Sequence, residues 1–282
     1  EMLRSLVGSE MCIRDRSITI PMQMSLCNVS YDVTSYDIQE GITHLNDFAF
    51  SHCRKLQNVQ IPQTLSEVGV YCFSNCTQLE EIDLSKSQIT KIPNYAFENC
   101  LSLKKVILPF SIKEIGENAF YNCEKLEKVV LTAPDLKKIG NKAFYCCEKL
   151  KDINLDFTSI EKIGDEAFYY CAKLKELVLP DTVTSIGKQC FMYCEGLQKA
   201  DISNTAIEKI RESTFEECRS LKKIVLPSSV KEIDANAFSY CSTLTDCKYS
   251  RDVKTADNIF EGCREYNSKA NQKRLAAERM AT

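Results

Sequence analysis

The chain repeats one short motif ten times, and this repetition constrains its fold more than any other feature of the sequence. Each copy ends in a Phe that is followed three residues later by a Cys. Consecutive phenylalanines are 23, 24, 23, 24, 24, 23, 24, 23 and 22 residues apart. A period this regular predicts a solenoid, in which each unit buries its apolar face only against its neighbours. The ten pairs are Phe50/Cys53, Phe73/Cys76, Phe97/Cys100, Phe120/Cys123, Phe144/Cys147, Phe168/Cys171, Phe191/Cys194, Phe215/Cys218, Phe238/Cys241 and Phe260/Cys263.

Each unit contains an alternating segment that predicts a short β-strand. After the Cys come two variable residues, a Leu, two more variable residues, and two aliphatic residues separated by one variable position, as in Leu103, Val106 and Leu108. Alternation places the aliphatic side chains in the core and leaves the variable ones outside. Strands at the same position of every unit are expected to stack into a parallel sheet.

The corner after each strand has two forms, which account for the alternating period. In four units of 23 residues Pro directly follows the strand, as in Leu108-Pro109, whereas the 24-residue units lack that Pro. Pro fixes φ and removes an N–H, so we expect a tighter corner that is one residue shorter. A Gly further along the unit, such as Gly116, indicates either a left-handed backbone or close packing. Pro93 at the same position contradicts the left-handed geometry.

Ten of the sixteen cysteines occupy one position of the repeat. One cysteine in every 23 or 24 residues matches neither the close paired spacing of zinc sites nor that of disulfide frameworks. Cysteine also behaves as a small, commonly buried hydrophobe. We therefore expect a column of packed thiols beside a column of core phenylalanines. Stacked strands lie about 4.8 Å apart, however, so distance alone leaves disulfides between neighbouring units open.

The repeats divide the chain into four parts. Residues 1–16 are predicted to be a non-native sequencing scar, because Glu10–Arg16 looks like a translated transposon end from library preparation. Residues 17–36 are predicted to form an N-terminal cap or partial repeat, and residues 37–263 a solenoid of about ten units. Residues 264–282 are expected to be a helical or disordered tail, with a partner-binding helix as the alternative.

Charge and motif content exclude several classes of function. The formal net charge is −3, with 36 basic and 39 acidic residues mixed along the chain, so nucleic acid is not an expected partner. No apolar run approaches the roughly 20 residues that cross a bilayer, so membrane insertion is not expected. The only histidines are His44 and His52, and no phosphate loop or nucleophile motif is present. We therefore expect a chain that is not an enzyme and has no catalytic residues, cofactor or metal.

The repeat resembles the leucine-rich repeats of the surface-antigen BspA-like type, whose unit is similar to Cys-x-x-Leu-x-x-Val-x-Leu-Pro-x-x-Val-x-x-Ile-Gly-x-x-Ala-Phe-x-x-Cys. The resemblance extends from Asp37 to Cys263. It implies a right-handed leucine-rich-repeat solenoid, a β-rich α/β coil with a parallel sheet on one face and short strands or helical turns on the other. It also implies a binding or adhesion role at a cell surface, with attachment to host proteins.

The exposed face of the predicted sheet is the candidate binding surface, because the fold leaves its residues free to vary. Four outward positions are aliphatic, and two of these, Ile107 and Val130, lie on adjacent strands. Exposed apolar clusters mark contact sites, although strand propensity alone also selects β-branched residues. Lysines and glutamates in the flanking columns predict a polar rim of mixed sign. The candidate residues are Gln60, Asp83, Lys105, Ile107, Lys128, Val130, Asn154, Glu176, Val178, Lys199, Asp201, Lys223 and Val225.

The partner expected for this face is a protein or glycoprotein, bound by a monomeric chain. Two roles fit this expectation: a cell-surface adhesin, or an intracellular scaffold that recruits a partner. The family resemblance favours the first role, whereas unpaired thiols survive best in reducing compartments and favour the second. A structural spacer without a dedicated ligand is the third alternative.

Overall fold

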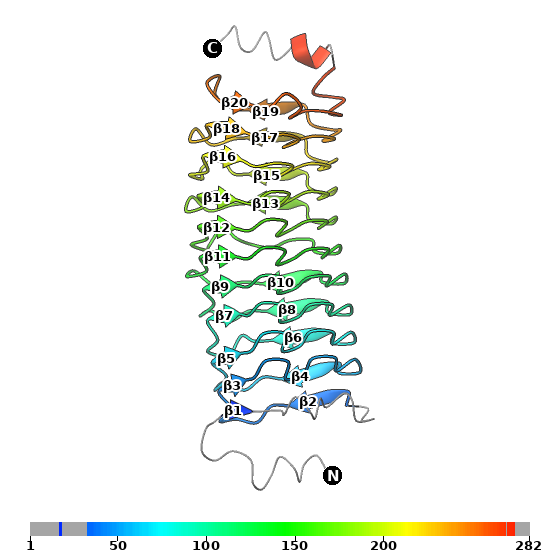
Figure 1. Cartoon of the computed structure of the whole chain (residues 1–282), viewed down its shortest axis with the longest axis vertical. Coiled ribbons are helices and arrows are strands. Elements are labelled where there is room, and N and C mark those ends of the chain that lie inside the picture. The colour runs from blue at the N-terminus through cyan, green and yellow to red at the C-terminus, as the bar shows by residue number, and fades with distance from the viewer. Residues whose placement is uncertain (1–16, 19–32, 269, 274–282) are drawn as a thin grey trace.

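The computed structural model describes residues 17–18, 33–268 and 270–273. It is a parallel-strand β-solenoid of about 10 turns, in which the coils are stacked into one elongated column. Two sets of short strands run along this column side by side (Figure 1). The predicted scar, residues 1–16, lies outside the described residues, as do most of the predicted cap and the end of the predicted tail.

The first set contains three-residue strands; from β4 to β17 the central residue is buried and the outer residues are directed outward, whereas Tyr36 in β2 is only partly buried and the first residue of β19, Asp246, is buried. They pair in parallel and in register, for example Lys105 with Lys128 and Ile107 with Val130. Three sheets result, β2-β4, β6-β8-β10 and β13-β15-β17-β19. In the coil between β10 and β13 only an isolated bridge forms, between Lys128 and Asp152. The strands are β2 (Ser35–Asp37), β4 (Asn58–Gln60), β6 (Glu81–Asp83), β8 (Lys105–Ile107), β10 (Lys128–Val130), β13 (Glu176–Val178), β15 (Lys199–Asp201), β17 (Lys223–Val225) and β19 (Asp246–Lys248). We call the outward surface of this set the strand face.

The second set contains two-residue strands, so this side of each coil is a short strand and not a helical turn. The strands form the parallel sheets β1-β3-β5, β7-β9-β11-β12-β14 and β16-β18-β20. Within the described part of the chain, helix is confined to residues 270–273. The strands are β1 (Ser17–Ile18), β3 (His44–Leu45), β5 (Glu67–Val68), β7 (Lys91–Ile92), β9 (Glu114–Ile115), β11 (Lys138–Ile139), β12 (Lys162–Ile163), β14 (Ser185–Ile186), β16 (Lys209–Ile210), β18 (Glu232–Ile233) and β20 (Lys254–Thr255).

The repeated Phe lies in a third segment of the coil, which is built from consecutive turns. Phe120 is flanked at two residues on either side by Asn118 and Asn122, whose φ angles are 53° and 58°. This backbone directs the N–H groups of alternate residues toward the next coil, so that Phe120 N donates to Ala143 O at 2.8 Å. The nine phenylalanines from Phe50 to Phe238 are almost completely buried, and ring centroids along the column are 5.1 to 5.7 Å apart. The predicted aromatic core is therefore present.

The glycine that recurs in the repeat reflects close packing and not a left-handed backbone. Gly116 has no positive φ. A Cβ at this position would lie 2.8 Å from both Asn94 N and Ile92 O in the preceding coil. Of the two explanations drawn from the sequence, close packing is correct at Gly116.

The cysteine column packs as predicted, with one exception. From Cys76 onward each ladder thiol donates to the carbonyl of the Phe in the preceding coil, as Cys123 Sγ does to Phe97 O at 3.2 Å. Burial raises the pKa of these thiols; for Cys76 it does so to about 12. Cys53, at the first ladder position, differs because it is disulfide-bonded.

The C-terminal end of the core is covered by residues that follow the last repeat. The ring of Tyr266 stacks on Phe260, with centroids 4.0 Å apart. Asn271, in the short helical segment, donates through Nδ2 to Thr245 O at 2.8 Å. These contacts cover the end of the phenylalanine column.

Candidate functional site

The strand face collects the candidate residues into two lanes that run along the solenoid. The first residue of each three-residue strand forms one lane and the last residue forms the other, because the strands stack in register. Twelve of the thirteen candidates occupy these strand positions. Asn154 is the exception, since it lies in the coil between β10 and β13, which forms no strand.

The lane of last residues contains the exposed aliphatic side chains. Ile107 and Val130 are direct partners on β8 and β10. Val178 and Val225 lie on either side of Asp201, which pairs with both. Val225 is 46% exposed, whereas the other three are half-buried. The structure therefore places four aliphatic side chains on the strand face, of which one is exposed and three are half-buried.

Three polar candidates, two in this lane and Asn154 at the equivalent position of the coil without a strand, have a structural role. Asp83, Asn154 and Asp201 each accept a hydrogen bond at Oδ1 from the backbone N–H two residues later, at 2.9, 3.1 and 3.2 Å. These Asx turns form corners that lack the Pro of the shorter units. The need to form a corner explains these residues, so contact with a partner stays a prediction for them.

Two residues that the sequence analysis did not select add to the apolar surface. Phe110 and Phe157 are 68% and 78% exposed, the highest values among the large hydrophobic side chains described. Each lies two residues after the last inward Leu of its strand segment, Leu108 and Leu155, at the corner beside the strand face. This position is polar in most other coils, for example Lys86, and is the small residue Ala133 in one of them. A large aromatic residue at a position that is otherwise polar or small was the signal that could have identified them.

The lane of first residues and the positions just before it are rich in lysine. Toward the N-terminus these lysines form ion pairs across coils: Lys104 Nζ lies 2.8 Å from Glu80, and Lys105 Nζ lies 3.7 Å from Glu81. The hydrogen bond from Lys104 lowers the pKa of Glu80. Further along, no carboxylate of the described residues forms an ion pair with any of a second group of lysines. This group comprises Lys128, Lys175, Lys199, Lys222 and Lys223.

The side formed by the two-residue strands differs, because single glutamates there often bridge two lysines. Glu114 lies 3.3 Å from Lys91 and 3.1 Å from Lys138. Partial burial alone would raise the pKa of Glu114, but hydrogen bonds and charge from the two lysines outweigh this effect and lower it. Glu232 bridges Lys209 and Lys254 in the same way. Most charged side chains on this side form ion pairs with one another.

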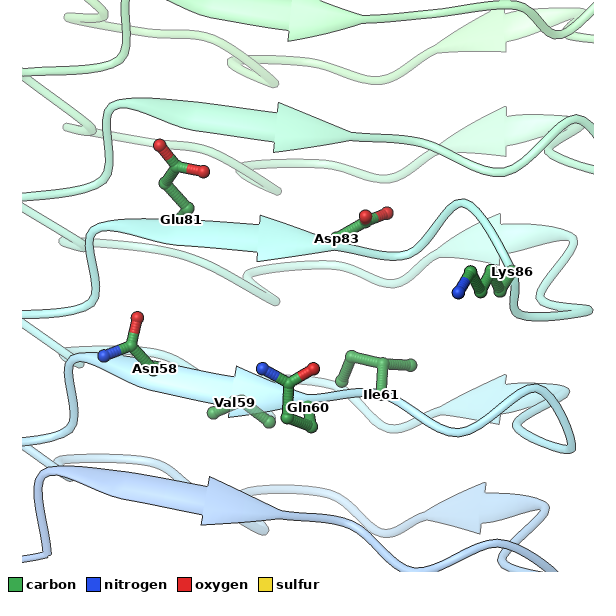
Figure 2. Close-up of a pocket in the computed structure, with 7 residues that line it drawn as sticks. All are labelled: Asn58, Val59, Gln60, Ile61, Glu81, Asp83 and Lys86. Atoms are coloured by element: carbon green, nitrogen blue, oxygen red, sulfur yellow. The ribbon is translucent and has the colours of Figure 1, made fainter.

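A shallow polar pocket of about 250 Å³ lies at the N-terminal end of the strand face (Figure 2). It lies between β4 and β6, which are neighbours in the stack but belong to separate hydrogen-bonded sheets. Two candidates, Gln60 and Asp83, are brought together here. The lining residues are Asn58, Val59, Gln60, Ile61, Glu81, Asp83 and Lys86.

Within residues 17–18, 33–268 and 270–273, no group of three or more His, Cys, Asp or Glu side chains could hold a metal ion. None of the helical residues described is part of a segment long and apolar enough to cross a bilayer. The strand face offers apolar side chains, amides and unpaired amines, which together suit contact with another macromolecule.

The comparisons with known proteins give one family and several solved structures. A family model described as "BspA type Leucine rich repeat region (6 copies)" matches residues 22–151 and 137–267. A leucine-rich repeat protein of T. pallidum is 25% identical, with a TM-score of 0.50, over 70% of this chain and 82% of that one. A leucine-rich cell surface protein of Faecalibacterium prausnitzii is 25% identical, with a TM-score of 0.45, over 88% of this chain and 83% of that one. No curated protein matches the chain.

Proposed function

The chain belongs to the BspA-type leucine-rich repeat family, and on this basis we propose that it is a non-catalytic scaffold that binds a protein ligand on its strand face at the cell surface. Solenoids present long surfaces of outward residues that carry binding function while the core supplies stability. The family and the repeat architecture therefore support a binding role of this kind.

The observation that carries this proposal is the group of apolar side chains that the fold leaves exposed on the strand face. Val225, at 46% exposed, and the corner residues Phe110 and Phe157 are among the few large hydrophobic side chains that are exposed. Strand propensity explains β-branched residues in strands, but it does not explain phenylalanines at exposed corners. Contact with a protein explains both.

Buried thiols weaken the argument for an intracellular scaffold. Most of the described free cysteines are buried, and the ladder thiols donate hydrogen bonds to Phe carbonyls. A thiol in this setting is protected from oxidants in any compartment. The unpaired cysteines are thus compatible with the cell surface.

The proposal is tested by affinity capture from host extracellular matrix and from cell lysate, with the identity of the captured proteins determined by mass spectrometry. Two variants alter the strand face, Val178→Lys with Val225→Lys, and Phe110→Ser with Phe157→Ser. A matched control adds two lysines beside the two-residue strands instead, at the exposed residues Thr90→Lys and Thr184→Lys. All proteins are first shown to have the same circular dichroism spectrum.

We expect the parent and the control to capture the same matrix protein and both strand-face variants to lose it. Equal capture by all four proteins would exclude the strand face as the binding site. Capture only from lysate would favour the intracellular scaffold, and no capture by the parent would favour a structural spacer.

A further inference from the structure

The C-terminal coils of the strand face contain a group of lysines that form no ion pair with the acidic residues described. Lys199 and Lys223 are direct partners on β15 and β17. Lys222 precedes Lys223, and Lys175 precedes β13. None of these four amines forms an ion pair within the described part of the chain. The nearest acidic positions in the lane, Glu176 and Asp246, pair with Lys199 and Lys223 in register but not as ion pairs.

Placing two lysines opposite each other is unfavourable for the sheet. Like charges at directly opposed strand positions repel and destabilise the pairing. In the two other directly opposed lysine pairs of the described strands, Lys105 with Lys128 and Lys138 with Lys162, one lysine of each pair forms an ion pair, with Glu81 and Glu114 respectively. No ion pair of this kind relieves the repulsion between Lys199 and Lys223, although Glu176 and Asp246 lie opposite them on the outer strands. A ligand that places carboxylates between Lys199 and Lys223 would relieve this repulsion.

An exposed apolar residue lies among these lysines. Val225 is 46% exposed and follows Lys223 by two residues on β17. Its partner on the next strand is Lys248, and its partner on the preceding strand is Asp201, whose carboxylate already accepts hydrogen bonds from Ser203. The surface therefore combines a positive edge with an apolar centre.

This combination distinguishes between classes of ligand. A sulfated glycan or another polyanion would pair with the lysines but would gain nothing from Val225 or Val178. A protein segment that carries both carboxylates and apolar side chains would use both lanes. The net charge of the whole chain is −3, so the positive charge is local and can select where an acidic partner docks.

We propose that the coils containing β13, β15 and β17 dock an acidic protein segment, with an apolar side chain of that segment on Val225 and its carboxylates between Lys199 and Lys223. This inference rests on the proposed function, since it specifies the chemistry of the partner that the strand face binds. It adds the location along the solenoid and the composition of the bound segment.

The test is a selection from a random 12-residue peptide library displayed on phage, with the full 282-residue chain as the target. Synthetic versions of the enriched peptides are then titrated against the parent and three variants by fluorescence anisotropy. The first variant is Lys199→Gln with Lys223→Gln, and the second is Val225→Asn. The matched control, Lys113→Gln with Lys162→Gln, removes two exposed lysines near the two-residue strands that also lack ion pairs.

We expect the enriched peptides to contain Asp or Glu together with apolar residues. The double lysine variant should weaken their binding by about tenfold, since each exposed pair contributes up to about 1 kcal/mol. Val225→Asn should also weaken binding, the control should not, and affinity should fall as the salt concentration rises.

Three results would overturn the inference, and they differ in what they imply for the proposed function. Enriched peptides that are not acidic but lose affinity for Val225→Asn would leave the strand face as a protein-binding surface with another specificity. Equal competition by a heparin fragment, with no effect of Val225→Asn, would make the site one for polyanions. No enriched peptide, or peptides that bind all variants equally, would count against both the segment and the proposed function.

Discussion

At the scale of single residues, burial determines the chemistry of the cysteines. Cys123 and Cys147 are completely buried, and each donates its S–H to a Phe carbonyl at 3.2 Å. Desolvation disfavours the thiolate, so the pKa of each thiol is raised. Such thiols act as small core residues and not as nucleophiles.

This burial predicts a loss of stability at alkaline pH. For Cys76, burial raises the pKa from 9.0 to about 12, so the folded state holds its proton more tightly than the unfolded state. The resulting stabilisation is present below pH 9.0 and is lost as pH rises toward 12. Over that window the free energy of unfolding falls by about 1.4 kcal/mol per pH unit for each buried thiol.

We therefore expect the urea midpoint to be constant between about pH 7 and 8 and to fall steeply above about pH 9. Labelling with a thiol reagent at about pH 8, analysed for each cysteine-containing peptide, provides the check. Cys123 should react only after unfolding, and labelling of the folded protein at the rate of the unfolded chain would contradict the prediction.

At the scale of elements, a corner of the coil can be formed by Pro or by an Asx turn. Asp201 accepts hydrogen bonds from Ser203 N at 3.2 Å and from Ser203 Oγ at 2.8 Å. We predict that Asp201→Ala lowers the free energy of unfolding by about 1–2 kcal/mol, because the corner loses a charge-assisted acceptor. Asp181→Ala, at an exposed position in a corner that contains Pro, should change it by less than about 0.5 kcal/mol. Urea titrations measure both, and equal losses would show that the Asx turn does not stabilise the corner.

The elements that the sequence predicted are those that depend on residue type within one coil. The three-residue strands follow from alternation, the two corner lengths from Pro109 and its equivalents, and the core columns from the Phe and Cys positions. For the two-residue strands, the family resemblance implied either short strands or helical turns. The left-handed positions on either side of the phenylalanines from Phe50 to Phe238 were not predictable in this way. Lys142, Glu166 and Gln189 occupy them as well as Asn118, so residue type gives no consistent signal.

The candidate site was predictable only in part, because its remaining features depend on contacts between coils. Val225 and Lys223 could be selected from alternation alone. The break between β4 and β6 and the irregular coil at Asn154 depend on how neighbouring coils align. The distinction between paired and unpaired lysines likewise requires distances across coils, and the exposure of Phe157 requires the geometry of its corner.

At the scale of the whole molecule, stability is expected to be the sum of contacts between neighbouring coils. Phe144 is completely buried and stacks at 5.2 Å on both Phe120 and Phe168. We predict that Phe144→Ala costs about 3–5 kcal/mol and splits unfolding into two steps. Phe260→Ala, in the last coil, should cost less and leave one main transition. Calorimetric scans of the two variants provide the measurement, and equal midpoints would contradict the stacked architecture.

The molecule also divides its surface charges between those that stabilise the fold and those that remain available to a partner. Removing Lys91 and Lys138 leaves Glu114 without its two partners, so Lys91→Gln with Lys138→Gln should lower the free energy of unfolding by several tenths to about 1 kcal/mol. Removing Lys199 and Lys223 breaks no ion pair and relieves a like-charge contact, so that double variant should be as stable as the parent or slightly more stable.

Urea midpoints in low salt measure this difference, and about 1 M NaCl, which screens exposed charges, should abolish it. A loss of stability in the Lys199→Gln, Lys223→Gln variant equal to that in the Lys91→Gln, Lys138→Gln variant would show that both groups serve the fold. Retained stability together with lost binding would instead indicate that Lys199 and Lys223 serve binding to a partner and not the stability of the isolated chain.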